Sequence, residues 1–92
     1  MNELIQQATA VSIGGQAVLF EGPPGCGKSS LALALIDRGA VLIGDDAVTL
    51  TQEAGRIVAS PPPNTGGLLE LRNVAIVTLP ATSAPVALIV QL

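Results

Sequence analysis

The sequence predicts an α/β fold in which one helix packs on a mixed sheet that is fed by β-hairpins. Short apolar runs rich in β-branched residues recur along the chain, turn residues separate them, and one segment has helical spacing of its apolar residues. With 92 residues, of which 49% are hydrophobic and Phe20 alone is aromatic, we expect a single domain over 1–92 with an aliphatic core. We also expect this domain to be incomplete at its C-terminus, because a strongly apolar strand pattern lies against the chain end.

Strand patterns occupy most of the chain. A predicted hairpin comes first, with strands at 9–13 and 16–20 joined by Gly14-Gly15. A wholly apolar run at 40–43 suits a strand that is buried on both faces of a sheet. A second surface hairpin and a C-terminal group of strands, divided by Pro80 and Pro85, follow. These later strands are expected at residues 47–50, 56–59, 68–71, 74–79 and 86–92.

One segment has the pattern of a helix. Leu31, Leu35 and Ile36 recur at helical spacing among good helix formers between residues 28 and 38. Gly39 follows, where the end of a helix favours glycine. We therefore expect a helix over 28–38 that begins directly after a glycine-rich loop.

The segment at 60–67 cannot be regular secondary structure. Its three prolines lack N–H donors, and its two glycines remove stiffness. We expect a loop that flanks the active site, or alternatively a solvent-exposed connector.

Composition excludes several classes of function. The formal net charge is −3 and charged residues make up 12% of the chain, so a basic surface for nucleic acid is not expected. No Lys or Arg precedes Lys28, and the apolar runs are shorter than the ~20 residues that cross a bilayer. Cys26, the single cysteine, cannot form an internal disulfide. These features predict a cytoplasmic protein that binds neither nucleic acid nor membrane.

The glycine-rich loop contains a complete phosphate-binding motif. A glycine, four residues, a glycine, a lysine and a serine lie between a predicted strand and a predicted helix. The candidate nucleotide-binding residues are Gly22, Pro23, Pro24, Gly25, Cys26, Gly27, Lys28, Ser29 and Ser30. The glycines free backbone N–H groups to converge on a phosphate, and the positive end of the helix dipole favours an anion. We predict that Lys28 bridges the β- and γ-phosphates of ATP and that the Ser29 hydroxyl binds Mg²⁺.

Two carboxylates follow the strand predicted after the helix. Asp45 and Asp46 close the apolar run at 40–43, so they should emerge at the end of the sheet near the phosphates. One carboxylate can hold the metal or its water while the other accepts a proton from an attacking hydroxyl. The alternative is an Asx-type turn after the strand.

The glycine-rich loop also has an alternative interpretation, which is a turn that binds no ligand. Within this loop, the thiol of Cys26 is expected to fill space, and a redox function is the alternative role.

Three stretches of the sequence together resemble a known family. They are residues 22–29, residues 35–48 with the sequence LIDRGAVLIGDDAV, and residues 68–76 with the sequence LLELRNVAI. From about residue 7 onward, the chain is similar to the catalytic domain of HPr kinase/phosphorylase, the bacterial enzyme that phosphorylates a serine of the phosphocarrier protein HPr. This resemblance implies a P-loop core of the HPr kinase/PEP carboxykinase type.

The resemblance also implies roles for individual residues. Asp46 would accept the proton in the kinase direction with support from Asp45, and Lys28 would orient phosphate. Ser29 and Glu70 would hold Mg²⁺; taken alone, Glu70 equally fits a solvent-facing strand residue. ATP would be the phosphate donor, HPr or a similar small protein the partner, and a hexamer the assembly. The same site would run a phosphorolysis, in which inorganic phosphate attacks phosphoserine.

The sequence departs from the family pattern at several positions. Gln7 stands where the family usually has a catalytic histidine, and the chain contains no histidine. Since glutamine exchanges hydrogen bonds but not protons, phosphorolysis is the activity least expected. Ser30 replaces an acid, Asn73 and Ala75 replace glycines, and the chain ends before a further family arginine. These departures favour an alternative function, a regulatory module that binds ATP without phosphoryl transfer. A small-molecule kinase is disfavoured, because three arginines are few for the lid that such enzymes use.

Overall fold

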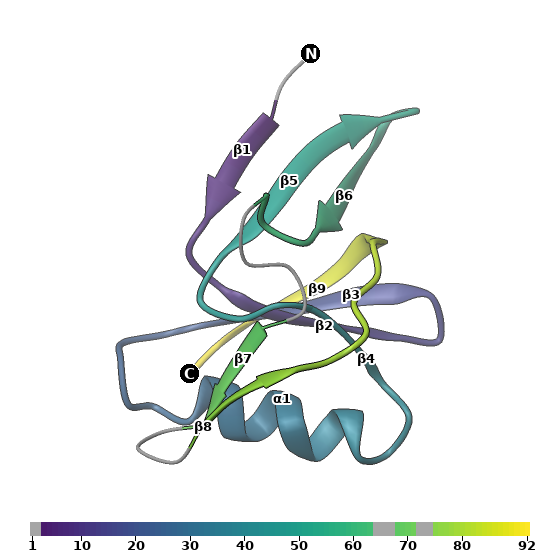
Figure 1. Ribbon diagram of the computed structural model, residues 1–92. Helices are drawn as coiled ribbons and strands as arrows, with labels where there is room; N and C mark the ends of the chain where they lie inside the picture. Colours follow the sequence, from purple (N-terminus) through teal and green to yellow (C-terminus); the bar gives the residue numbers. More distant parts are fainter. Residues whose placement is uncertain (1–2, 64–67, 72–74) are drawn as a thin grey trace.

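Strands dominate the computed structural model, which describes residues 3–63, 68–71 and 75–92, with the side chains of 3–63 and 79–92 (Figure 1). The elements in chain order are β1 (Glu3–Gln6), β2 (Thr9–Ile13), β3 (Gln16–Glu21), α1 (Lys28–Ile36), β4 (Val41–Gly44), β5 (Val48–Glu53), β6 (Arg56–Ser60), β7 (Leu68–Leu71), β8 (Ala75–Thr78) and β9 (Ala84–Gln91). This is the α/β arrangement, with more strand than helix, that the sequence predicts. No helix of the described part is long and apolar enough to cross a membrane.

Seven of the described strands form one mixed sheet in the order β1-β5-β6-β9-β3-β2-β4, and β7 pairs with β8 in a separate hairpin. Within the sheet, β3 and β9 run parallel and the other neighbouring pairs run antiparallel. In Figure 1, α1 lies at one end of the molecule, while β1 and the β5–β6 hairpin extend away from it. The predicted mixed sheet is therefore confirmed, and β3 leads directly into the glycine-rich loop.

Both predicted hairpins are present, and each turns on two residues with positive φ. Gly14 and Gly15 have φ of 58° and 82°, and Ala54 and Gly55 have φ of 51° and 78°. Two consecutive positive φ values are the requirement of a type I′ turn, whose twist matches that of the flanking strands. Ala54 adopts this conformation without being a glycine.

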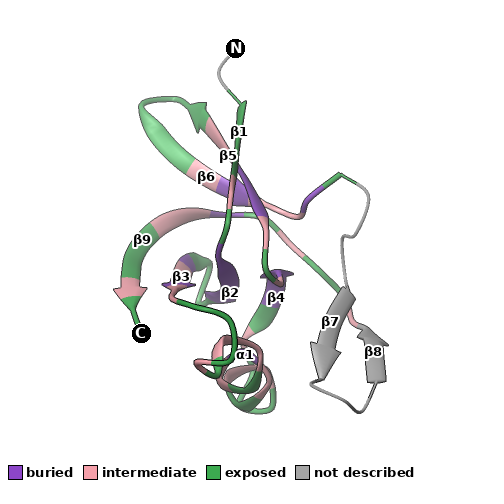
Figure 2. Cartoon of the chain, turned by 90° about the vertical axis from the view of Figure 1, so that its left-hand side faces the viewer, coloured by how far each residue is buried: buried purple, intermediate pink, exposed green. Residues whose placement is uncertain are grey.

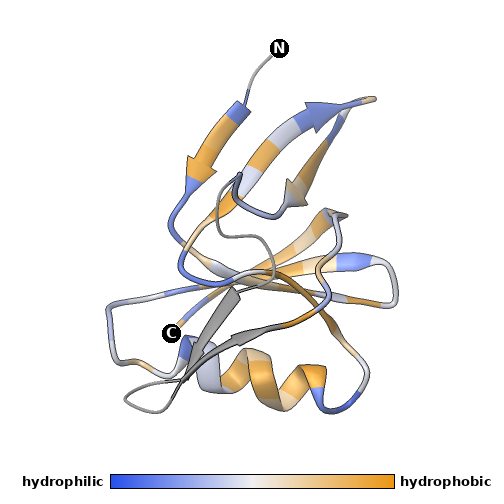
Figure 3. Cartoon of the chain, viewed as in Figure 1, coloured by the Kyte–Doolittle hydropathy of each residue, from blue (hydrophilic) through white to orange (hydrophobic). Residues whose placement is uncertain are grey.

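The two faces of the sheet hold separate apolar clusters. Because side chains alternate across a strand, neighbouring residues enter different clusters. Val11 and Leu42 pack with α1, whereas Ala10 and Ile43 pack on the opposite face. Figure 2 shows buried residues on β2, β3 and β4 and at the base of the β5–β6 hairpin, whose tip is exposed. Figure 3 shows the hydrophobic stretches of α1 and β4.

Helix α1 has the expected glycine at its C-terminal end. Gly39 has φ of 106°, and its N–H donates to the carbonyl of Ile36 while that of Ala40 donates to Leu35, both at 3.0 Å. This bond pair is a Schellman motif, which satisfies carbonyls that the helix leaves unpaired. Leu35 and Ile36 also pack against the sheet. The motif anchors the helix and returns the chain directly to β4.

Three features were not predicted from the sequence. Strand β4 packs side chains into both clusters, as expected for a strand buried on both faces, and it stands last in the strand order, beside β2. Pro85 does not separate strands but lies inside β9 opposite Val58, near the start of the strand, where proline is tolerated. The pairing of β1 with β5 was not predicted, because Leu4 and Ile5 break the alternation that marks a strand.

Candidate functional site

The glycine-rich loop joins the end of β3 to the start of α1, the connection that the sequence predicts. Gly25 and Gly27 have φ of 80° and 97°, a region that favours glycine. Gly27 is the N-cap of α1, and it makes no side-chain capping bond, nor does the first turn contain an acidic residue. The first N–H groups of the helix are thus left without a side-chain partner, and the positive end of the dipole is uncompensated.

The ammonium group of Lys28 folds back onto the loop. Its Nζ donates to the carbonyl of Gly22 at 2.8 Å and to that of Pro23 at 3.2 Å, and it lies 3.9 Å from the Sγ of Cys26. An ammonium has three N–H donors, and sulfur is a weak acceptor. An arriving phosphate oxygen could therefore replace the sulfur contact without breaking the two carbonyl bonds.

The Ser29 hydroxyl connects the helix start to the end of β4. Its Oγ donates to the Oδ1 of Asp45 at 2.7 Å, across a sequence separation of 16 residues. The same Oδ1 accepts the hydroxyl of Thr9 at 3.0 Å, and the Thr9 Oγ1 accepts the backbone N–H of Asp46 at 3.3 Å. Asp46 has φ of 67°, which Asp adopts more readily than most residues. The loop, the helix and both aspartates thus meet through one hydrogen-bond network.

A pocket of about 380 Å³ opens beside this network. Its lining residues come from the glycine-rich loop, the first turn of α1 and the turn after β4. They are Pro24, Gly25, Gly27, Lys28, Ser29, Ser30 and Asp46. Asp45 lies behind Ser29 and is half-buried, whereas Asp46 is exposed at the pocket wall. The pocket therefore combines a cationic residue, Lys28, the loop glycines before the helix and an aspartate, Asp46.

The chemistry of these groups suits a phosphate with its cation. Glycine backbone, an uncapped helix start and Lys28 all favour an anion, and hydroxyl and carboxylate oxygens are ligands that Mg²⁺ accepts. Among the described residues there is no cluster of three or more His, Cys, Asp or Glu suited to a metal. Of the residues that the structure describes, Ser29 and the two aspartates could offer oxygen ligands to a Mg²⁺ ion here.

Two predicted features lie partly or wholly outside the described side chains. The backbone of Glu70 pairs with Ile76 in the β7–β8 hairpin, and β7 lies next to α1, but the Glu70 carboxylate is outside the described part. The loop predicted at 60–67 begins one residue later than expected, because Ser60 still pairs with Thr49 as the last residue of β6, and its described residues end at Pro63. Pro62 lies against Gly44, directly before the aspartates, which agrees with a loop that flanks the site.

Sequence reasoning missed two groups that support the site. Thr9, fully buried at the start of β2, contacts both aspartates. Glu21, at the end of β3, accepts amide N–H groups from Gln6 at 2.8 Å and from Gln91 at 2.5 Å, so it ties β1 and β9 to the strand that enters the loop. No local pattern marks either residue, because their partners are brought near only by the strand order.

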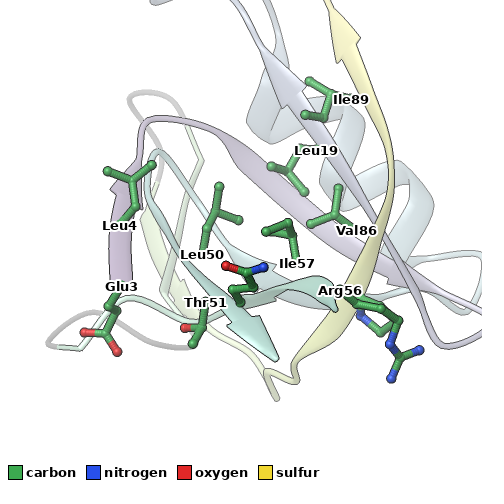
Figure 4. Close-up of a pocket in the computed structure, with 11 residues that line it drawn as sticks. Glu3, Leu4, Leu19, Leu50, Thr51, Arg56, Ile57, Val86 and Ile89 are labelled. Atoms are coloured by element: carbon green, nitrogen blue, oxygen red, sulfur yellow. The ribbon is translucent and has the colours of Figure 1, made fainter. Parts of the chain in front are cut away.

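A second, larger hollow of about 820 Å³ lies on the sheet away from the loop, and it shares no lining residue with the first (Figure 4). Its wall is mainly aliphatic, and Figure 4 shows Leu4, Leu50, Ile57 and Val86 around it with Arg56 at its rim. It offers hydrophobic contact, whereas the smaller pocket is lined by a lysine, two serines and an aspartate and is the candidate site.

Comparison with known proteins identifies the family of this chain. The family model described as HPr Serine kinase C-terminal domain matches residues 2–83. The chain belongs to this family. The resemblance drawn from residues 22–29, 35–48 and 68–76 is thereby confirmed.

Individual relatives of the HPr serine kinase C-terminal domain agree in sequence and in fold. An HPr kinase/phosphorylase from Clostridium tetani is 41% identical over 71 residues, covering 77% of this chain and 23% of the relative. One from Mycoplasma mycoides subsp. mycoides SC is 33% identical over 95 residues, covering 95% of this chain and 30% of the relative. The solved structure of the Hpr(Ser) kinase/phosphatase from Coxiella burnetii superposes with a TM-score of 0.87 at 30% identity, covering 96% of this chain and 58% of that one. The match to this chain thus covers about a quarter of the length of these two curated relatives.

Proposed function

We propose that this chain is the nucleotide-binding part of a cytoplasmic serine kinase that uses ATP and Mg²⁺ to phosphorylate the phosphocarrier protein HPr or a similar small protein. The observation that carries the proposal is the bond from Ser29 to Asp45, which joins the glycine-rich loop to the aspartate pair. It supports a phosphoryl-transfer site because phosphate-binding groups and a proton acceptor then share one pocket. Membership of the HPr serine kinase family supports the choice of a protein serine as acceptor.

Each residue takes a role that its position allows. The backbone of Gly25 and Gly27 and the ammonium of Lys28 hold the phosphates, and the hydroxyls of Ser29 and Ser30 stand at the helix start. Ser29 would hold Mg²⁺ together with Glu70, as the family resemblance implies. Bound Mg²⁺ would neutralise the negative charge on the phosphates.

The reaction needs one proton acceptor, and we assign that role to Asp46. The serine oxygen of the partner attacks the γ-phosphorus, a bond from that oxygen to phosphorus forms, and the bond to the β,γ-bridging oxygen breaks, so that ADP leaves. The Asp46 carboxylate, exposed at the pocket wall, takes the proton of the serine hydroxyl. Asp45 supports it from behind through its bonds to Ser29 and Thr9.

A second candidate function is an ATP-binding regulatory module without transfer activity. The observation in its favour is the absence of histidine from the chain, with Gln7 in the place of the family histidine. A glutamine cannot trade a proton near neutral pH, so we also expect the reverse phosphorolysis to be the weaker reaction.

The two candidates are separated by measuring transfer and binding on the same protein. Incubation with Mg-ATP and purified HPr should yield phosphoserine, detected by mass spectrometry, and Asp46→Asn should slow the transfer by about 10²- to 10⁴-fold. Nucleotide affinity by calorimetry should change little in Asp46→Asn. The matched control is Asp37→Asn, which removes an exposed carboxylate at the far end of α1 and should transfer phosphate normally. Tight binding with no phosphoserine in any variant would replace the kinase by the regulatory module.

Self-association is part of the same proposal. Leu4, Ile57 and Ile89 are 59%, 46% and 50% exposed, which is high for large apolar side chains and favours burial against another subunit. Light scattering should give a mass several times 9.2 kDa, and a hexamer is expected from the family resemblance. A monomeric mass at micromolar concentration would contradict this part alone.

A further inference from the structure

Thr9 is a hydroxyl residue buried beneath the candidate site. It is the first residue of β2 and is 0% exposed, although no feature of a strand requires a polar side chain there. Its Oγ1 contacts the Oδ1 of Asp45 and the backbone N–H of Asp46. A buried hydroxyl is tolerated only when it is hydrogen-bonded, and both of these bonds go to the aspartate pair.

The direction of each bond follows from the chemistry of the groups. The N–H of Asp46 can only donate, so the Thr9 oxygen accepts there at 3.3 Å. The hydroxyl proton is then directed at the Oδ1 of Asp45 at 3.0 Å. One side chain therefore holds the carboxylate of one aspartate and the backbone of the next.

The consequence reaches Ser29 through Asp45. The Ser29 hydroxyl donates its proton to the same Oδ1 at 2.7 Å, so its oxygen lone pairs are directed away from Asp45. Since Ser29 lines the pocket, those lone pairs can serve a cation or phosphate-bound water there. If Asp45 were free to rotate, this orientation of Ser29 would be lost.

The second bond acts on the backbone of Asp46. With φ of 67°, Asp46 is in the left-handed region, which non-glycine residues hold only when their surroundings fix it. The bond from its N–H to Thr9 supplies such a constraint from β2, a strand 37 residues away in sequence. The Asp46 carboxylate is thereby placed at the pocket wall rather than left on a mobile turn.

We infer that Thr9 is a positioning residue: its buried hydroxyl sets Asp45 against Ser29 and holds Asp46 in its left-handed conformation. The role of these residues in phosphoryl transfer rests on the proposed function, whereas the positioning itself does not. Supporting groups behind the ligands of a site typically change activity or metal affinity by about 10- to 100-fold when they are removed.

The test compares Thr9→Val, which keeps the shape but removes the hydroxyl, with Thr9→Ser, which keeps the hydroxyl. Thr9→Val should lower kcat and raise the Mg²⁺ concentration needed for half-maximal rate, and the product of these two changes should be about 10- to 100-fold. The affinity for ATP measured without Mg²⁺ should stay within about threefold of the wild-type value. Thr9→Ser should restore most of the rate. Ser12→Ala, which removes another buried hydroxyl from β2, is the matched control and should leave both quantities unchanged.

A second measurement needs neither nucleotide nor activity. In the wild type, hydrogen exchange followed by NMR should find the amide of Asp46 protected although the residue is exposed, and Thr9→Val should speed its exchange by about 10-fold or more. An unprotected Asp46 amide in the wild type overturns the inference even if Thr9→Val does not fold. Equal exchange rates of the Asp46 amide in Thr9→Val and in the wild type also overturn it, as does a measurable transfer rate that Thr9→Val and Thr9→Ser lower by the same factor. Loss of Asp46 protection in Thr9→Val, with no transfer in any variant, leaves the positioning intact and removes the proposed kinase function.

Discussion

Substitution of Gly44 by alanine should displace the turn that carries both aspartates. Gly44 is the last residue of β4 and is buried. A Cβ at this position would stand 2.3 Å from the carbonyl oxygen of Ala47, 2.9 Å from the Cγ1 of Val48 and 3.1 Å from the Cδ of Pro62. Real Cβ atoms essentially never show contacts under 3.0 Å. Because the nearest atom belongs to the backbone, no side-chain rotation can relieve the overlap, and the turn itself must move.

The expected loss of stability follows from the number and the kind of these contacts. Overpacking of a buried position typically costs about 1–3 kcal/mol, and we expect about 3 kcal/mol here because the overlap is with backbone. For a domain of this size, that corresponds to a fall in Tm of about 12–24 °C. Nucleotide-dependent activity should fall as well, since the bond of 2.7 Å between Ser29 and Asp45 requires the turn to stay in place.

Thermal unfolding followed by circular dichroism measures this effect, with Gly14→Ala as the control. Gly14 has φ of +58° and no atom within 4 Å of its ideal Cβ, so alanine there meets backbone strain alone. The control should lose about 1 kcal/mol, or roughly 4–8 °C. A Gly44→Ala protein that melts within a few degrees of the wild type, or no lower than Gly14→Ala, would refute the steric argument.

Three further predictions concern a turn, the core and the loop. Ala54→Asn should stabilise the protein by about 1 kcal/mol, because Asn tolerates the φ of 51° that Ala54 adopts before Gly55. The gain should appear as a higher midpoint of urea unfolding, and an unchanged midpoint would contradict the turn assignment. Leu42→Ala should lower the free energy of unfolding by about 2–5 kcal/mol, because Leu42 is 1% exposed and packs in the cluster with α1. Leu88→Ala, at a 55% exposed position, should change it by no more than about 0.5 kcal/mol, and equal losses would contradict the placement of the core. Lys28→Ala should weaken Mg-ATP binding by about 10- to 100-fold in calorimetry, the worth of one charge-assisted hydrogen bond, and an unaltered affinity would remove Lys28 from the site.

Local features of the fold could be predicted from sequence because their causes are local. The helix ends at Ile36, close to the expected boundary, since Gly39 supplies the left-handed residue that its C-terminus requires. Both hairpins turn on two successive residues with positive φ, which are Gly14 and Gly15 in the first and Ala54 and Gly55 in the second. The match of the glycine-rich loop to a phosphate-binding motif is equally local, because that motif requires glycines, a lysine and a hydroxyl at fixed spacing.

Strand order could not be predicted, because backbone hydrogen bonds form between any two strands that the topology brings together. β9 inserts between β6 and β3, so the last strand of the chain stands beside the strand that enters the loop. From the sequence, Pro85 was expected to divide two strands, whereas it lies inside β9 near its start. The residues of β1 showed no recognisable strand pattern.

The sequence by itself determined which groups are available to the site: the loop glycines, Lys28, Ser29 and the aspartate pair, each identified by spacing or by its place after a strand. Only the tertiary structure decided that Ser29 reaches Asp45 and that Thr9 lies beneath both aspartates, across separations of 16, 36 and 37 residues. The physical reason is that spacing along the chain is fixed by covalent geometry, whereas contact between distant residues depends on how the sheet is ordered and which faces are buried.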